Sequence, residues 1–217
     1  MGHERETTEW LRRHLGRSAR VGRPLVGGVT SDVWLVETDD RVAVLKRVTN
    51  DDWLAERPDV VEHEAMVLQW LEAGSIPVPA VLGVDATGSE TGSPSLLLTY
   101  IDGVPAGETA SPAAWMAPLV DTAVAILSLD PPDWVRPFRR YLDASQAVPP
   151  TWAIDAGIWH DAIEVVRESA PAAQNGFIHR DFHAWNVLWN EAVVGVVDWS
   201  QASVGPISMD VAHCRAN

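Results

Sequence analysis

Acidic and amide side chains near the end of the chain have the spacing of a phosphoryl-transfer site. Asp181 lies five residues before Asn186 (186 − 181), and Asp198 lies 17 residues after Asp181 (198 − 181), where an apolar run ends. In such a set one carboxylate accepts the proton of an attacking hydroxyl, while an amide oxygen and a second carboxylate hold a metal ion on nucleotide phosphates. The spacing therefore predicts that Asp181 is the base and that Asn186 and Asp198 bind Mg²⁺. The alternative is that the first two are turn residues beside a strand.

A zinc-dependent hydrolase is a third interpretation of the same segment. His179, Asp181 and His183 alternate, so a strand would place three potential ligands on one face. Cys214 is the only cysteine and His213 is isolated in the sequence, so no further cluster completes such a site. A zinc site would also leave the later amide and acid without a role. We expect His179 to pack beneath the loop, and His183 either to approach the γ-phosphate or to support the loop.

The motif His-x-Asp-x-x-x-x-Asn at 179–186, followed by a strand and Asp198-Trp199, resembles the aminoglycoside phosphotransferase and choline kinase family. The resemblance implies an α+β, protein-kinase-like fold with two lobes. We expect a small antiparallel β lobe over 1–101, which binds nucleotide, and a mainly helical catalytic lobe over 102–217. The resemblance also implies ATP or GTP as co-substrate, Mg²⁺, and a small hydroxylated acceptor such as an aminoglycoside or another antibiotic, hence a role in resistance.

The chain contains one lysine, Lys46, in an apolar run with strand character at 41–48. Kinases use a lysine on the third strand to hold phosphates, and it pairs with a glutamate on the following helix. Apolar residues at helical spacing after Pro58 predict that helix. The family resemblance makes Glu64 the expected partner. Glu62 is the alternative, because residues two apart on a helix point in different directions.

Two strand-like runs flank a Gly-Gly turn at 27–28, which predicts a hairpin. The resemblance implies that this hairpin covers the nucleotide phosphates. Backbone N–H groups around Gly28 and the hydroxyls of Thr30 and Ser31 would then donate to phosphate oxygens. The turn lacks the full Gly-x-Gly-x-x-Gly pattern, so an ordinary hairpin turn is the alternative.

A second apolar run, at 95–101, ends in Asp102-Gly103 and resembles the strand that leads into the hinge of these kinases. The resemblance implies that adenine binds there to the backbone of Thr99 and Ile101. Recognition of adenine by the backbone would explain why the side chains of this segment show no distinctive pattern.

Composition restricts the partners. The chain has 217 residues and a formal charge of −14, and no apolar run is as long as a membrane span. The negative charge argues against nucleic acid and anionic membranes as partners and suits a cationic acceptor, such as an amino sugar. A single cysteine suits the reducing cytoplasm. Residues 1–16 predict an amphipathic helix and not a secretory signal. Nothing in the sequence addresses the oligomeric state.

The second half of the chain predicts helices at 119–129 and 151–169, separated by a loop. Asp210 resembles the helix aspartate that binds the catalytic-loop backbone in kinase-like folds. The sequence ends at Asn217, whereas full members of the family continue through helices that line the acceptor pocket. We therefore expect a truncated catalytic lobe. The alternative to an active kinase is a non-catalytic nucleotide-binding protein or a gene fragment.

Overall fold

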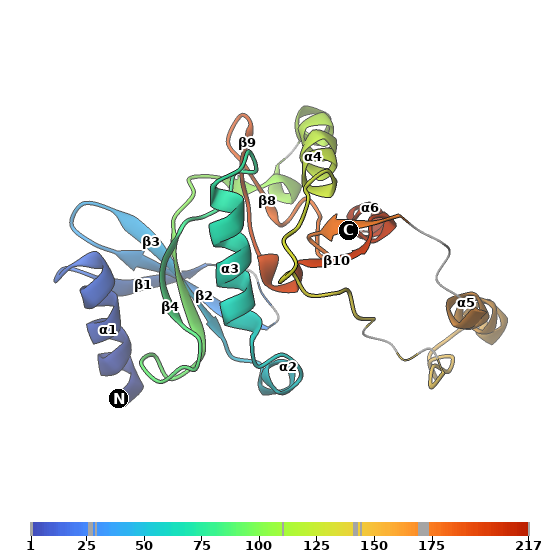
Figure 1. Ribbon diagram of the computed structural model, residues 1–217, viewed down its shortest axis with the longest axis horizontal. Helices are drawn as coiled ribbons and strands as arrows, with labels where there is room; N and C mark the ends of the chain where they lie inside the picture. The colour runs from blue at the N-terminus through green and yellow to red at the C-terminus, as the bar shows by residue number, and fades with distance from the viewer. Residues whose placement is uncertain are drawn as a thin grey trace.

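The computed structural model describes residues 2–25, 28, 30–109, 111–140, 143, 145–168 and 174–216. Its largest sheet has five strands in the order β1-β2-β3-β5-β4, and all neighbouring pairs are antiparallel (Figure 1). The strands are β1 (Arg20–Leu25), β2 (Ser31–Glu37), β3 (Val42–Val48), β4 (Val81–Asp85) and β5 (Ser95–Thr99). The predicted hairpin and the predicted antiparallel sheet are both present.

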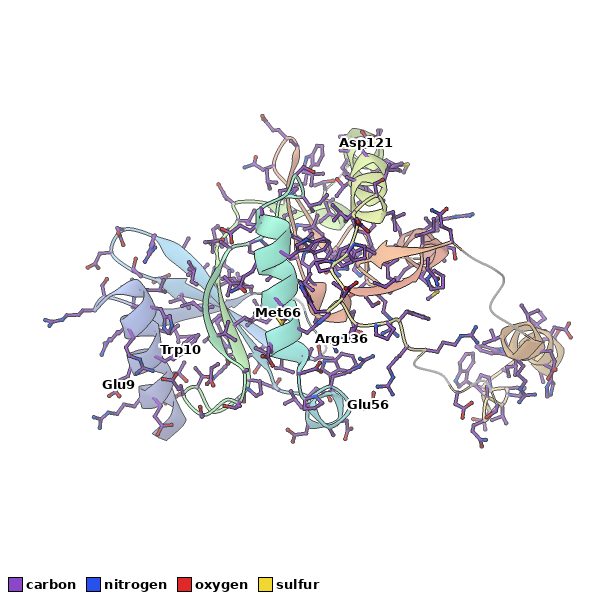
Figure 2. All side chains as sticks on the ribbon, viewed as in Figure 1. Glu9, Trp10, Glu56, Met66, Asp121 and Arg136 are labelled. Carbon is purple, nitrogen blue, oxygen red and sulfur yellow. The ribbon has the colours of Figure 1, made fainter. Side chains whose placement is uncertain are left out.

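One face of this sheet is covered by the predicted amphipathic helix, α1 (Gly2–Leu15). Trp10 of α1 is buried with Ala43 and Leu45 of β3, in a core of its own. Figure 2 shows Trp10 on the inner side of α1 and Glu9 on its outer side. Alternation along β3 sends every second side chain to this face.

The other face of the sheet packs on α3 (Val60–Glu72). Val44 and Val48 of β3 contact the larger core, which includes the buried stripe of α3. Lys46 lies between them in the alternation, so its side chain also points toward α3. The side of the sheet on which the single lysine falls is therefore fixed by the apolar residues around it.

Beyond the large sheet, the chain combines helices with two small antiparallel sheets, β6-β8-β9 and β10-β7. The remaining elements are α2 (Asp51–Glu56), β6 (Val104–Pro105), the 3-10 helix η1 (Ala106–Glu108), α4 (Pro112–Leu127), α5 (Ala156–Glu168), β7 (Asn175–Ile178), β8 (Val187–Trp189), β9 (Val193–Val196), the 3-10 helix η2 (Trp199–Gln201), β10 (Ser203–Pro206) and α6 (Ser208–Ala216).

The larger core joins α3 to the second half of the chain. Phe177 of β7 stacks on Trp199 of η2, with ring centroids 5.9 Å apart. The backbone N–H of Val196 donates to the carbonyl of Pro77 at 2.8 Å. These contacts fix the strand before Asp198 against the entry to β4. A division into lobes at residue 101 remains a prediction. In the part of the chain that the structure describes, no helix combines the length and apolar character that a membrane crossing needs.

Two predicted helix starts were wrong. The helix expected to start at 119 is α4, which begins seven residues earlier at Pro112 (119 − 112). Proline fits the first helical turn, where the backbone needs no N–H partner. The second, α5, begins at Ala156 and not at 151, since the Asp155 carboxylate accepts the Gly157 N–H at 2.8 Å and caps the helix there. Figure 1 shows α5 standing apart from the rest of the molecule.

Candidate active site

Lys46 forms a buried three-membered ion cluster. Its Nζ lies 2.8 and 2.7 Å from the two carboxylate oxygens of Glu64, and 2.7 Å from Oδ1 of Asp198. The side chain of Glu64 is 2% exposed and that of Asp198 is 36% exposed. The structure thus brings together three residues that are far apart in the sequence.

The choice between Glu62 and Glu64 of α3 follows from the helix face. Glu64 lies one turn from Val60 and one turn from Leu68, both in the larger core, so it is buried with them. Glu62 is exposed. The alternative prediction, that Glu62 pairs with Lys46, is therefore wrong.

The charges in the cluster reinforce one another. Burial alone would lower the pKa of the Lys46 ammonium, but Asp198 and Glu64 raise it above its ordinary value. Burial raises the pKa of the Asp198 carboxyl, but the charge and hydrogen bond of Lys46, together with the hydrogen bond of Ser200, hold it below its ordinary value. Lys46 is therefore cationic and Asp198 anionic at neutral pH. The single ammonium of Lys46 faces the two carboxylates of Glu64 and Asp198. The negative charge that it does not neutralise favours binding of a further cation.

Asp198 owes its position to an unusual backbone conformation. Its φ of 64° and ψ of 60° lie in the left-handed region, where the strand stops and η2 begins. Few non-glycine residues adopt this region, although aspartate tolerates it. The Ser200 hydroxyl donates to Oδ1 at 3.0 Å and steadies the carboxylate.

The loop at 179–186, which carries the predicted catalytic motif and is called the catalytic loop below, is held by Asp210 of α6. The Asp210 carboxylate accepts the backbone N–H groups of His179 at 2.8 Å and of Arg180 at 2.6 Å, as the sequence predicts. His179 is buried, and its Nε2 lies 3.0 Å from the carbonyl oxygen of Val197. The imidazole therefore links the loop to the strand before Asp198. It takes no part in a cluster with Asp181 and His183.

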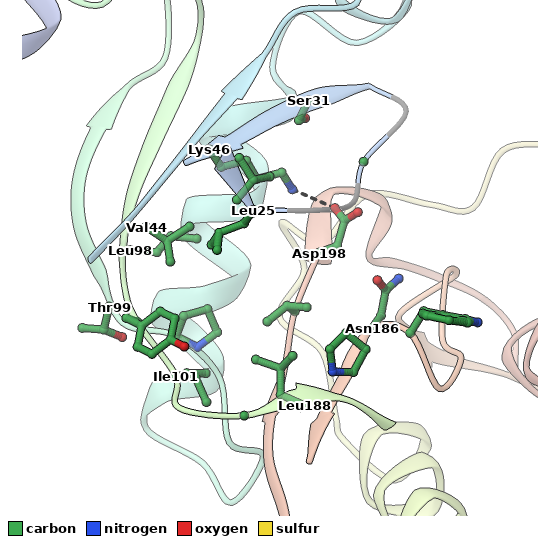
Figure 3. A pocket seen from close by; sticks show the side chains of 18 of the residues that line it. Leu25, Ser31, Val44, Lys46, Leu98, Thr99, Ile101, Asn186, Leu188 and Asp198 are labelled. Carbon is green, nitrogen blue, oxygen red and sulfur yellow. Dashed lines mark hydrogen bonds and ion pairs between the residues drawn. The ribbon is translucent and has the colours of Figure 1, made fainter. Parts of the chain in front are cut away.

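Asp181 and Asn186 are fixed by each other. The Nδ2 amide of Asn186 donates to the backbone carbonyl of Asp181 at 2.9 Å and to its Oδ2 at 3.0 Å. Because the NH₂ group faces Asp181, Oδ1 of Asn186 is turned away from it. Figure 3 shows Asn186 and Asp198 reaching into the same pocket.

Two histidines face the other carboxylate oxygen of Asp181. Nε2 of His183 lies 3.3 Å from Oδ1, and Nε2 of His213 lies 3.2 Å from it. Burial raises the pKa of Asp181, but the hydrogen bond and charge of His183 and the charges of the other nearby histidines lower it to about 2. The expectation that His213 is isolated was wrong, because α6 carries it back to the loop.

A cavity of about 430 Å³ opens between the large sheet and this loop. Lys46 and Asp198 line one end of it, and Thr99 and Ile101 line the other (Figure 3). The Thr99 N–H donates to the carbonyl of Ala80 at 2.9 Å. A base bound at this end would therefore use the Thr99 carbonyl or the backbone of Ile101.

The residues of the hairpin turn also line the cavity. Gly28, Thr30 and Ser31 lie along it, whereas residues 26, 27 and 29 are outside the described part of the chain. Gly28 has a φ of +104°, and a Cβ there would come within 2.7 Å of the Ser31 carbonyl oxygen. Only glycine meets both conditions without strain.

A sequence profile described as the phosphotransferase enzyme family (APH) matches residues 21–217, which include every residue of this cavity. The chain belongs to this family. No curated protein sequence matches the chain significantly. The family match confirms the resemblance that the catalytic segment indicates.

Solved structures share the fold of this chain. Aminoglycoside-3′-phosphotransferase of type VIII is 17% identical with a TM-score of 0.71, and the match covers 100% of this chain and 83% of that one. A thermostable APH(4)-Ia in complex with ADP and hygromycin B is 18% identical, with a TM-score of 0.64 and coverage of 96% and 75%. A putative aminoglycoside phosphotransferase from Ralstonia eutropha JMP134 is 15% identical, with a TM-score of 0.67 and coverage of 97% and 68%. These likenesses establish the protein-kinase-like fold of the family.

The oxygen donors at this cavity fit a magnesium ion. Asp198 offers a carboxylate beside the cavity, and the orientation of Asn186 presents an amide oxygen rather than its NH₂ group. Mg²⁺ takes a few hard oxygen ligands of this kind and completes its shell with phosphates and waters. The excess negative charge around Lys46 favours a cation at the same place.

Sequence reasoning missed two residues of the site. His213 could have been found, because it lies three residues after Asp210 on α6 and must face the same loop. Trp185 lines the cavity and is half exposed. A Cβ at Gly107 would meet its ring at 2.8 Å, so the glycine makes room for the indole. No pattern in the sequence connects these two distant positions.

Proposed function

We propose that the protein transfers the γ-phosphoryl group of ATP or GTP to a hydroxyl group of a small molecule. The observation that carries the proposal is the convergence on one cavity. The Lys46–Glu64–Asp198 cluster lies at one wall, Asn186 faces it, and Asp181 is bonded to Asn186. Phosphoryl transfer needs little covalent chemistry from the protein and depends on such positioned charges. Membership of the phosphotransferase enzyme family supports the reaction class.

In this proposal the chain holds the nucleotide at three places. The hairpin turn with Gly28, Thr30 and Ser31 covers the phosphates, Lys46 binds them, and the backbone near Thr99 and Ile101 takes the base. Glu64 keeps the lysine pointed into the cavity. Asn186 and Asp198 would hold Mg²⁺, which when bound neutralises charge on the phosphate oxygens.

Asp181 then serves as the base for the acceptor hydroxyl. Its low pKa keeps it ionised at neutral pH, and the bonds from Asn186 hold one of its oxygens in place. A carboxylate within hydrogen-bond reach of the hydroxyl accepts its proton as the bond to phosphorus forms. The residue acts by position more than by basicity, because a group with so low a pKa is a weak base in the ground state.

The acceptor we propose is a small hydroxylated amine, with aminoglycosides and other antibiotics as the first candidates. The chain carries a formal charge of −14, which attracts cations. Similar structures were solved with hygromycin B and with spectinomycin. Resistance to such compounds and a cytoplasmic location would follow from this activity.

An ATP-consumption screen over hydroxylated amines and antibiotics tests the proposal. We expect acceptor-dependent release of ADP that needs Mg²⁺ and is abolished in Asp181→Asn. The same variant should retain a rise in melting temperature with Mg²⁺ and ATP, because Asp181 does not hold the nucleotide. Asp161→Asn, on the exposed face of α5, is the matched control and should leave turnover unchanged.

The outcomes separate three cases. Transfer that survives in Asp181→Asn would remove that residue from the mechanism. Nucleotide binding without transfer to any acceptor would favour the non-catalytic nucleotide-binding protein. Absence of nucleotide binding in a folded protein would contradict the proposed function altogether.

A further inference from the structure

Three side chains beside the catalytic loop converge on one point. One carboxylate oxygen of Asp181 and one imidazole nitrogen each of His183 and His213 lie within 4.8 Å of one another. The carboxylate oxygen is 3.3 Å from the first imidazole nitrogen and 3.2 Å from the second. Two of the three come from the loop and the third from α6, so tertiary structure and not local sequence makes the cluster.

The orientation of His213 is fixed by the backbone. Its Nδ1 lies 3.2 Å from the carbonyl oxygen of Arg180, and only a protonated Nδ1 can donate to a carbonyl. A neutral imidazole carries one N–H, so its Nε2 lone pair then faces Oδ1 of Asp181. Two acceptors in this position require a proton or a metal ion between them. Histidines that bind metals often donate their other N–H to a backbone carbonyl in this way.

We propose that Asp181, His183 and His213 form a binding site for a divalent transition metal ion of the Zn²⁺ class, separate from the magnesium position at Asn186 and Asp198. Tetrahedral zinc has bonds of about 2.0–2.1 Å to nitrogen and oxygen, so neighbouring ligand atoms are roughly 3.3–3.4 Å apart. The distances from Oδ1 of Asp181 to the two imidazole nitrogens, 3.2 and 3.3 Å, match this separation between neighbouring ligand atoms. Two imidazoles select zinc, cobalt or nickel over magnesium, which prefers oxygen.

The two histidines are unequal ligands. Nδ1 of His183 lies 3.2 Å from the backbone nitrogen of Trp185 and accepts its N–H. Binding a metal through Nε2 would move the imidazole proton to Nδ1 and give up this hydrogen bond. His213 needs no such change. The side chains of Asp181 and His213 are about a third exposed, at 33% and 35%, so a fourth position remains open to water. Three protein ligands and one open position are typical of reactive and exchangeable zinc sites.

Occupation of this site would remove Asp181 from phosphoryl transfer. The carboxylate oxygen that a metal binds can no longer accept a proton from an acceptor hydroxyl. Zn²⁺ would therefore act as an inhibitor that competes with the acceptor and not with the nucleotide. The binding itself does not depend on the proposed kinase activity.

Titration of the tag-free protein with Co²⁺, followed by visible absorption, tests the proposal. A tetrahedral cobalt site gives a visible spectrum, and Zn²⁺ in turn should displace the cobalt. We expect one equivalent to bind, with affinity weakened at least about tenfold in His213→Ala and less in His183→Ala. The matched controls are His160→Ala, an exposed histidine of α5, and Cys214→Ser, the neighbouring thiol; both should bind as the unchanged protein does.

A spectrum that persists in His213→Ala, that is lost in Cys214→Ser, or that is displaced by equimolar Mg²⁺ would overturn the proposal, as would no spectrum at all. The magnesium-dependent shift in melting temperature with ATP is measured on the same samples. It reports on the nucleotide site alone, so failure of the metal site and failure of the proposed function are distinguishable.

Discussion

Removal of the Lys46 ammonium exposes the energetics of the site most clearly. In Lys46→Met the side chain keeps its length but no longer neutralises Glu64, which is 2% exposed and accepts two hydrogen bonds from the lysine. Breaking a buried ion pair on one side costs about 3–5 kcal/mol, because the remaining charge is left without a partner. For a chain of this size that corresponds to a fall in melting temperature of about 6–20 °C.

The stability lost in Lys46→Met should depend on pH, and the direction follows from the pKa of Glu64. Burial raises the pKa of Glu64, and in the variant no ammonium opposes this. A carboxyl whose pKa is raised on folding binds more protons in the folded state, so the folded state loses stability as pH rises above the unfolded pKa of about 4.3. The melting temperature of Lys46→Met should therefore fall further below that of the unchanged protein at pH 7 than at pH 5.

Thermal unfolding by circular dichroism at both pH values provides the assay. Arg20→Met is the matched control, since Arg20 and Glu37 lie 2.8 Å apart with side chains 61% and 37% exposed. An exposed pair contributes about 1 kcal/mol at most. Equal losses in the two variants, or a loss in Lys46→Met that does not shrink at pH 5, would refute the account of the buried cluster.

Three further substitutions test other parts of the structure. Gly28→Ala should weaken ATP binding and lower the free energy of unfolding in urea by about 1–3 kcal/mol. The backbone of Gly28 has a positive φ, and a Cβ there would come within 2.7 Å of the Ser31 carbonyl oxygen. Unchanged ATP affinity would contradict this. Asp210→Asn should lower the free energy of unfolding by about 1–3 kcal/mol and should lower turnover. The two Asp210 oxygens each accept one buried backbone N–H, and the substitution replaces one of these oxygens with an NH₂ group. Unaltered turnover would show that the loop needs no such support. Burial and the charge of Arg136 lower the pKa of His63 to about 4, so the unchanged protein should lose about 2–3 kcal/mol as pH falls from 6.5 to 4, because only the unfolded state gains this proton. His63→Gln should flatten that profile, and a parallel profile would contradict the assignment.

The proximity of the candidate site residues could be predicted from the sequence better than the packing around them. The pairing of Lys46 with Glu64 followed from the family resemblance, and its physical reason is that Glu64 shares a helix face with the buried Val60 and Leu68. The spacing of Asp181, Asn186 and Asp198 reflects a local strand-loop-strand unit, so short-range patterns describe it. Lys46, Glu64, Asn186 and Asp198 line the cavity, and Asp181 is hydrogen-bonded to Asn186 beside it.

What the sequence could not supply depends on long-range contacts. His213 reaches Asp181 only because Asp210 anchors α6 under the catalytic loop. The position of Trp185 depends on the absence of a side chain at Gly107, which is 78 residues away (185 − 107). Helix starts also failed where a proline or a capping aspartate, and not periodicity, decided the boundary.

Calorimetric titration with ATP asks whether the cavity between the large sheet and the catalytic loop binds a nucleotide through a metal ion. We expect saturable binding of one ATP in the presence of Mg²⁺, weakened strongly by chelation of the metal and by Asp198→Asn. The Asp161→Asn control on α5 should bind normally. Binding that is indifferent to both Mg²⁺ and Asp198→Asn, or no binding by the folded protein, would contradict it.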